Sequence, residues 1–170
     1  MSTAAVGLSV EEYLSTSYRP DCDYVDGMLE ERNLGEFDHS LIQGLICAQL
    51  LIWAKQSDAY VLPEQRVKVR AGRYRIPDVC LIRREDREPV ISKPPLLCVE
   101  VLSPCDTLHN MVERLNDYIA MGVPVCWVVD PAARRGYTFD RGGLHPVEDG
   151  IMRLEATTLE LSLDALFAEF

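Results

Sequence analysis

The chain has 170 residues, 48% of them apolar and 26% charged, and its 27 Asp and Glu outnumber 17 Lys and Arg to give a net charge of −10. This length favours one domain over residues 1–170, and the composition excludes disordered, collagen-like and fibrous classes. The acidic balance also makes the surface as a whole repel nucleic acid and anionic membranes. The longest uncharged run, 39–54, is shorter than the roughly 20 apolar residues of a membrane span. No Lys or Arg precedes Arg19, so we expect a cytoplasmic protein with no membrane partner.

The N-terminal third predicts two helices and a hairpin. Ser9 and Glu12 form a capping-box pattern for a short helix near 9–16, and Asp26-Gly27 is typical of a two-residue hairpin turn. Residues 38–55 predict a long helix that is apolar around most of its circumference. Such a helix must be covered by a sheet or by a second copy of the chain. We therefore expect a homodimer or higher homo-oligomer.

The middle of the chain predicts strands around a third helix. Bases alternate with Val67 and Val69 in 65–70, and the chain turns at Ala71-Gly72 and returns through 74–82. Residues 96–102 and 123–129 are nearly continuous apolar runs, as expected of central strands covered on both faces. The remaining elements are an amphipathic helix near 106–121 that ends at Gly122, short strands near 136–141 and 144–148, and a helix near 163–169. The sequence thus predicts a mixed α/β fold with one sheet.

Cysteines and bases are distributed unevenly. The six cysteines form no C-x-x-C pair and lie mostly in apolar runs, which favours reduced core thiols over structural zinc. Residues 66–93 hold nine bases against four acids, so an otherwise acidic protein has one basic stretch. This stretch can bind a polyanion locally, or it can be the solvated face of a hairpin.

Two acids interrupt the apolar strands. Asp78 lies within Ile76–Ile82, and Glu100 lies within Leu97–Leu102. Ionised carboxylates in apolar strands are costly unless they are paired or bound to a metal, and two neighbouring carboxylates raise each other's pKa unless a cation neutralises them. Mg²⁺ is commonly held by one or two carboxylates together with substrate phosphate. The alternative is that each acid pairs with an arginine, of which Arg75 is the obvious candidate for Asp78.

These residues occur in an order and spacing that resemble the Uma-type restriction endonuclease family of the PD-(D/E)XK nuclease superfamily. The resemblance covers residues 21–140, and its joint pattern is specific although no single segment is. Its segments are Tyr24-Val25-Asp26-Gly27 with Glu31, then His39, Arg75-Ile76-Pro77-Asp78, Glu100-Val101-Leu102-Ser103-Pro104, Tyr118, Gly122-Val123 and Trp127-Val128-Val129-Asp130-Pro131.

The resemblance implies a restriction-endonuclease-like fold, with a mixed sheet flanked by helices. Asp78 and Glu100 would hold Mg²⁺ (or Mn²⁺) with the backbone carbonyl of Val101, and a metal-activated water would attack a phosphodiester of DNA. Glu31 would serve as an accessory ligand or base. Substrate binding is expected from His39, Arg75, Arg66 and Lys68, although His39 could equally cap a helix.

The sequence departs from the family pattern in three places. Leu102 occupies the slot where the superfamily usually has Lys, and in this family the lysine is found on the next helix, at the position of Arg114. Arg114 can hold a phosphate but can hardly act as a base, because its guanidinium stays charged. Asn110 and Met28 stand where relatives often have Asp and Glu.

Two interpretations follow from these departures. The first is a metal-dependent DNA endonuclease in which Asp78, Glu100, Arg114 and Glu31 are catalytic. The second is a catalytically degenerate nuclease fold that serves as a DNA-binding or assembly module. For Arg114 by itself, the alternative to a role in the site is a surface helix residue that pairs with Asp117 or Glu113.

Overall fold

The computed structural model describes residues 7–32 and 36–168. Its helices are α1 (Val10–Ser15), α2 (Phe37–Ala54), the 3-10 helix η1 (Arg84–Asp86), α3 (Leu108–Met121) and α4 (Leu163–Phe167). Its strands are β1 (Cys22–Val25), β2 (Met28–Glu31), β3 (Ala59–Pro63), β4 (Val67–Arg70), β5 (Arg73–Arg75), β6 (Val79–Arg83), β7 (Leu97–Val101), β8 (Cys126–Asp130), β9 (Arg135–Asp140), β10 (Gly143–Pro146), β11 (Ile151–Arg153) and β12 (Glu160–Ser162).

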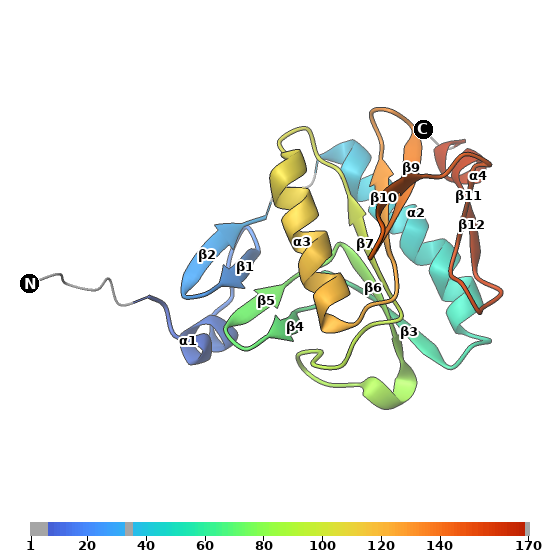
Figure 1. Ribbon diagram of the computed structural model, residues 1–170. Coiled ribbons are helices and arrows are strands. Elements are labelled where there is room, and N and C mark those ends of the chain that lie inside the picture. The colour runs from blue at the N-terminus through green and yellow to red at the C-terminus, as the bar shows by residue number, and fades with distance from the viewer. Residues whose placement is uncertain (1–6, 33–35, 169–170) are drawn as a thin grey trace, which may run out of the picture.

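The centre of the molecule is a six-stranded mixed sheet in the order β10-β9-β8-β7-β6-β3 (Figure 1). Only β7 and β8 run parallel, and α3 connects them, as the two apolar runs and the amphipathic segment between them predict. Strands β7 and β8 are buried along almost their whole length because helices cover both faces of the sheet. The predicted mixed α/β fold with flanking helices is thus confirmed.

The two long helices pack on opposite faces of this sheet. Ile42, Ile46 and Leu50 of α2 lie in one core with the odd-numbered side chains of β6 and β7. Met111 and Leu115 of α3 lie in the other core with the even-numbered ones. By length and composition alone, α2 could cross a membrane, but here its buried face packs along a sheet.

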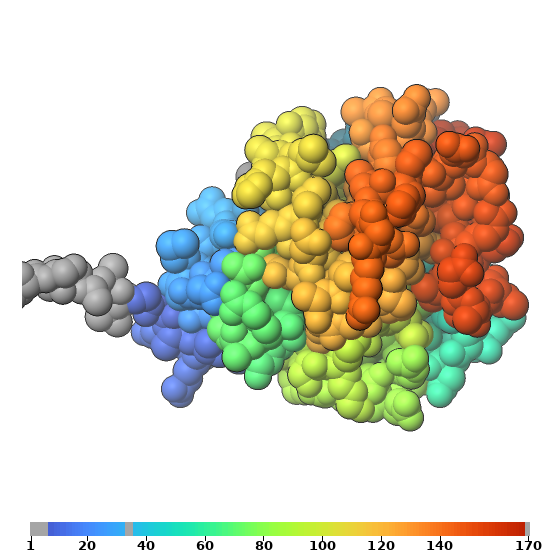
Figure 2. Space-filling model, viewed as in Figure 1, coloured from blue at the N-terminus to red at the C-terminus, as the bar shows by residue number. Residues whose placement is uncertain are grey.

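A smaller four-stranded sheet, β2-β1-β5-β4, lies beside α3, and Figure 2 shows its strands against that helix on one face of the molecule. The predicted hairpin joins β1 to β2, with Asp26 (φ 50°) and Gly27 (φ 95°) both in left-handed conformations that match the twist of the paired strands. Helix α1 begins at the predicted capping box and packs Tyr13 against Tyr24 and Tyr74. In β4 the bases alternate with buried valines, also as predicted.

The expectation of one sheet is wrong, because the predicted return strand 74–82 divides between two sheets. Strand β5 pairs with β1 and β4, whereas β6 pairs with β3 and β7. Between them, Pro77 has no N–H to donate, and the N–H of Ile76 donates to the Asp23 carboxylate instead of to a strand. The chain therefore leaves the small sheet after Arg75 and enters the central sheet at Val79, and Asp78 is the residue directly before β6. Strands β11 and β12 form a third sheet that the sequence did not predict.

All six cysteines lie in the described part of the chain and are free. Cys80, Cys98 and Cys126 are fully buried and register with one another across β6, β7 and β8, on the face covered by α3. Burial raises the pKa of the Cys80 thiol to about 12. These are core thiols, as the sequence predicts, and only Cys105 is exposed.

Candidate active site

Asp78 and Glu100 are brought together by the pairing of β6 with β7. Val79 pairs with Val99 in this antiparallel ladder, so continuing the register by one residue places Asp78 opposite Glu100. Opposite residues of an antiparallel pair project to the same face of the sheet, here the face covered by α3. Asp78 is buried and Glu100 is 0% exposed. The convergence that the sequence predicts is therefore present.

Both carboxylates are held by hydrogen bonds from the surrounding protein. Asp78 Oδ2 accepts the backbone N–H of Val101 at 2.7 Å and lies 3.3 Å from His39 Nε2. The hydroxyl of Tyr118, from α3, donates to Glu100 Oε1 at 2.7 Å. These contacts fix the orientation of each carboxylate before any ligand arrives.

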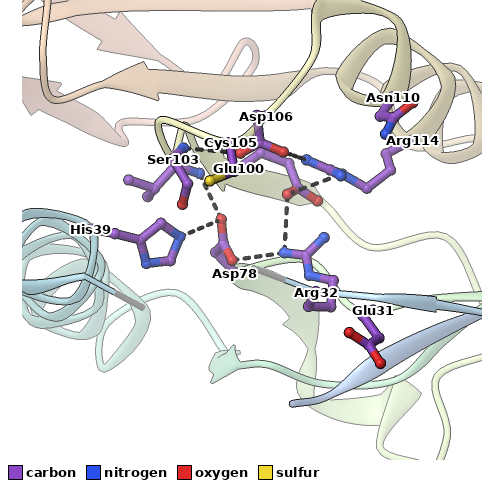
Figure 3. Close-up of a pocket in the computed structure, with 11 residues that line it drawn as sticks. Glu31, Arg32, His39, Asp78, Glu100, Ser103, Cys105, Asp106, Asn110 and Arg114 are labelled. Atoms are coloured by element: carbon purple, nitrogen blue, oxygen red, sulfur yellow. Dashed lines mark hydrogen bonds and ion pairs between the residues drawn. The ribbon is translucent and has the colours of Figure 1, made fainter. Parts of the chain in front are cut away.

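Arg32 links the two acids. Its Nη2 lies 2.7 Å from Asp78 Oδ1 and 3.2 Å from Glu100 Oε2, and Figure 3 shows the guanidinium between them. Each acid thus has a guanidinium partner, but for Asp78 it is Arg32 rather than the expected Arg75. No local pattern indicates this pairing, because Arg32 is separated from its partners by 46 and 68 residues.

Arg114 reaches the same site from α3. Its Nη2 donates to Asp106 Oδ1 at 2.8 Å, and its Nε lies 3.6 Å from Glu100 Oε2. The backbone N–H of Ser103 donates to the other oxygen of Asp106 at 2.9 Å, which fixes that acid in turn. Arg114 is thus turned toward Glu100, as its helix position predicts, and it pairs with Asp106 rather than with Asp117 or Glu113.

Burial and charge act in opposite directions on the two acids. Burial raises the pKa of Asp78, but the hydrogen bond from His39 and the charge of Arg32 outweigh it, so its pKa lies below the usual value. Burial also raises the pKa of Glu100, and there Arg32 and Arg114 offset it only in part. The pKa of His39 lies above its usual value, because its contact with Asp78 outweighs the opposing effect of burial. Neighbouring acids with opposite shifts are typical of functional sites.

A small, strongly polar pocket of about 70 Å³ opens onto this cluster. Its lining is Glu31, Arg32, His39, Asp78, Glu100, Val101, Ser103, Cys105, Asp106, Asn110 and Arg114. Three nitrogens of these side chains are buried and lack a hydrogen-bond partner within the described residues, namely Arg32 Nη1, His39 Nδ1 and Arg114 Nε. Buried polar atoms without partners are uncommon in folded proteins and indicate a ligand or water. Because two of these three nitrogens belong to guanidinium groups, an anion is a suitable ligand for this pocket.

The other predicted site residues lie in different surroundings. Glu31 lines the pocket, but Figure 3 shows its carboxylate turned away from Asp78 and Glu100. Arg75 is 1% exposed and its guanidinium contacts Asp23, Glu30 and Asp117, so it is not available to a substrate.

Two bases of β4 and the loop before it were also expected to contact the substrate. The Arg66 guanidinium donates to the carbonyls of Leu14 and Thr16 and lies over the Tyr13 ring, so its contacts are internal to the small sheet and α1. Lys68 is exposed on β4.

Sequence reasoning missed three residues of this cluster. Arg32 and Asp106 lie among other polar residues, where a charge is unremarkable. Tyr118 belongs to the apolar stripe of the amphipathic helix predicted near 106–121, although the hydroxyl of a buried tyrosine normally needs a hydrogen-bond partner. Its place four residues after Arg114, on the same helix face, is the signal that could have found it.

The carboxylate oxygens of Asp78 and Glu100 are suitable ligands for a hard dication, but the Arg32 guanidinium occupies the position between them. Two carboxylate oxygens converge on one cationic nitrogen, and one or two carboxylates together with water and substrate phosphate are the usual ligands of Mg²⁺. Within the described residues, no group of three His, Cys, Asp or Glu side chains forms a ready ligand cluster. Any metal would thus be held by the two acids, the Val101 carbonyl and water, in the place that the Arg32 guanidinium takes here.

Comparison with known structures identifies the fold. The crystal structure of a protein described as a putative nuclease belonging to DUF820, from Anabaena variabilis ATCC 29413, superposes with a TM-score of 0.84 at 19% identity. The alignment covers 95% of this chain and 98% of that one. A DrdV–DNA complex matches with a TM-score of only 0.40 at 18% identity, over 72% of this chain and 10% of that one. No curated protein matches the sequence.

The chain therefore has the same mixed α/β fold as the Anabaena variabilis protein. Residues 10–166 match the family Uma2, whose description is "Putative restriction endonuclease". The chain belongs to this family.

Proposed function

We propose that the protein is a metal-dependent endonuclease that hydrolyses DNA phosphodiester bonds. The observation that carries the proposal is the pair of buried carboxylates, Asp78 and Glu100, that face each other from β6 and β7 and share one cation at the bottom of a polar pocket. Membership of the Uma2 family supports the same reading.

Asp78, Glu100 and the carbonyl of Val101 would hold Mg²⁺ or Mn²⁺. When bound, the ion supplies a water of lowered pKa and neutralises charge that develops on the phosphate. The Val101 N–H and the Tyr118 hydroxyl keep the two carboxylates oriented toward the shared cation position. This orientation is fixed by the strands and α3, so it does not have to be created when substrate binds.

The pocket donors would bind the scissile phosphate. Arg114 is held by Asp106 with its Nε free of a hydrogen bond, and His39 Nδ1 is likewise unpartnered. A guanidinium suits a phosphate oxygen but cannot accept a proton, so we assign Arg114 to charge stabilisation. Glu31, at the pocket rim, is the remaining candidate for an accessory base, and Lys68 for a contact with the DNA backbone.

A DNA-cleavage assay tests the proposal. Plasmid and single-stranded DNA are incubated with the full chain and Mg²⁺ or Mn²⁺, and wild type is compared with Asp78→Asn and Glu100→Gln. We expect either substitution to slow cleavage by about a hundredfold or more, since metal-ion stabilisation is worth several kcal/mol. The control is Asp140→Asn, which removes a surface acid of β9 outside the pocket. Cleavage by the two site variants at the wild-type rate would contradict the proposal.

A catalytically inactive DNA-binding or assembly module is the second candidate. The ion pairs of Arg32 with both acids and the presence of Leu102 in place of the usual lysine favour it. Wild type that binds duplex DNA but does not cut it with either metal would support this second function.

We also propose that the chain self-associates as a homodimer or higher homo-oligomer. Helix α2 leaves Phe37 78% and Ile52 67% exposed, although its opposite face is deeply buried. Exposed apolar groups on one element are typical of contacts between protein chains.

A further inference from the structure

Arg32 occupies the point on which both acids converge. A single nitrogen, Nη2, contacts Asp78 Oδ1 at 2.7 Å and Glu100 Oε2 at 3.2 Å. The side chain is only 13% exposed, and the backbone N–H of Arg32 itself donates to the Asp21 carbonyl at 2.8 Å. The position of the guanidinium is therefore set by β1 and β2, from outside the sheet that carries the acids.

The charges explain why a cation is needed there. Two buried carboxylates facing each other repel strongly unless a positive group lies between them. In this structure Arg32 is that group, and Arg114 and Asp106 form a second pair beside it. A dication would neutralise the same two carboxylates. It would also need the same volume, so Arg32 and a dication exclude each other.

Only one of the two terminal nitrogens of Arg32 contacts the acids. Its Nη2 makes both ion pairs, whereas its Nη1 is buried with no hydrogen-bond partner among the described residues. Arg114 differs, because its Nη2 is fixed by Asp106 at 2.8 Å. Displacing the Arg32 guanidinium breaks its hydrogen bonds to the two acids, and the dication replaces those contacts. It also moves a positive charge away from the buried Asp23, whose pKa Arg32 lowers.

We infer that Arg32 is a tethered competitor of the catalytic metal, so that the acid pair accepts a dication only when the Arg32 side chain has left it. This inference rests on the metal site of the proposed function and adds a residue that sets metal affinity. In the structure the Arg32 guanidinium occupies the position between the two carboxylates, so the site is closed to a dication. Opening it costs the ion pairs of Arg32, and the apparent affinity for metal is reduced by the fraction of molecules that are closed.

The test is calorimetric titration of Mn²⁺ into the full chain without DNA. Arg32→Met keeps much of the side-chain volume and removes the charge, and Arg70→Met is the matched control because Arg70 pairs with Asp26 at the surface. We expect Arg32→Met to bind Mn²⁺ about tenfold more tightly than wild type, as for a site that is closed in about nine molecules of ten. Arg70→Met should bind like wild type, and adding Asp78→Asn to Arg32→Met should abolish the heat.

Thermal unfolding with and without Mn²⁺ gives a second readout. Without metal, Arg32→Met should melt below wild type because two buried carboxylates lose their cation, and Mn²⁺ should raise its melting temperature more than that of wild type. Arg32→Lys keeps the charge and serves if Arg32→Met does not fold. A lysine presents one ammonium on a flexible stem, so we expect its Mn²⁺ affinity to fall between those of wild type and Arg32→Met.

The outcomes separate this inference from the proposed function. Mn²⁺ affinity that is unchanged or weaker in Arg32→Met overturns the inference, even if wild type cuts DNA. Tighter Mn²⁺ binding by Arg32→Met supports it, even if neither protein cuts DNA and the endonuclease proposal fails.

Discussion

At the scale of single residues, Arg75 shows how a base in a polyanion-binding sequence pattern can have a purely internal role. Its guanidinium contacts Glu30 of β2 at 2.6 Å, Asp117 of α3 at 2.7 Å and Asp23 of β1 at 3.0 Å. Three elements that lie 42 to 52 residues from Arg75 in sequence therefore contact one buried charge. The arginine that was expected to meet DNA instead ties the small sheet to α3.

We expect Arg75→Met to lower the free energy of unfolding by about 3–5 kcal/mol, because it leaves the buried carboxylate of Asp23 without its ion-pair partner. Urea denaturation measures this difference. The control is Arg153→Met, which breaks the surface pairs of Arg153 with Asp149 and Glu160 and should change stability far less. A variant at position 75 that keeps wild-type stability but loses DNA binding would restore the substrate role.

The site residues differ in how visible they are in the sequence. Asp78 and Glu100 stand out because a charged side chain in a buried strand is costly unless it is paired or bound to a metal. The orientation of Arg114 toward Glu100 could be predicted from its position on the helix. Arg32 could not be found in this way, since its meaning depends on where the β1–β2 hairpin lies relative to β6 and β7. That relation is a tertiary contact, which no local pattern encodes.

At the scale of elements, the strongest predictions came from long periodic or continuously apolar segments. Strands β7 and β8 and helices α2 and α3 are of this kind, and each forms within two or three residues of its expected bounds. The split of 74–82 into β5 and β6 was missed, because both halves have strand-like side chains. They are separated by Pro77, which has no N–H, and by the hydrogen bond from Ile76 to Asp23, which is a tertiary contact. Strands β11 and β12 have three residues each, too few to show a period, and β3 has no alternation of polar and apolar residues in its sequence AYVLP.

Substitution of two glycines by alanine should change the stability of the protein in opposite directions. Gly122 ends α3 with φ 113°, where an added Cβ would also lie 3.2 Å from Pro94 Cγ, whereas Gly44 lies inside α2 with nothing within 4 Å of such a Cβ. We expect Gly122→Ala to destabilise the protein by about 1–2 kcal/mol and Gly44→Ala to stabilise it by about 0.5–1 kcal/mol. Urea denaturation of the two variants checks both signs. Shifts in the same direction would contradict this account.

At the scale of the whole molecule, the net charge of −10 and the basic stretch at 66–93 need to be considered together. Most of that stretch is already engaged: Arg70 and Arg73 pair with Asp26, Arg84 with Asp58 and Lys93 with Asp86. The positive charge is thus largely neutralised within the fold, and no broad basic surface follows from the sequence count. DNA binding would depend mainly on the pocket, and we expect it to weaken as salt is added.

The exposed apolar side chains of α2 lead us to expect that the chain self-associates through this helix. Light scattering should give wild type the mass of a dimer or higher oligomer, and Ile52→Glu should reduce that mass by placing a charge at the contact. Leu144→Glu is the matched control, because Leu144 is an exposed apolar residue of β10, outside α2. A monomeric wild type, or equal masses for all three proteins, would contradict self-association through α2.

The exposure of Cys105 at the pocket has a practical consequence. Four of the other five cysteines are buried and Cys47 is half-buried, so a thiol-reactive dye added to the native protein should attach first at Cys105. A fluorophore there would sit at the mouth of the polar pocket without any engineered residue. The natural chain therefore carries its own attachment point for following, by changes in emission, the arrival of ions or oligonucleotides.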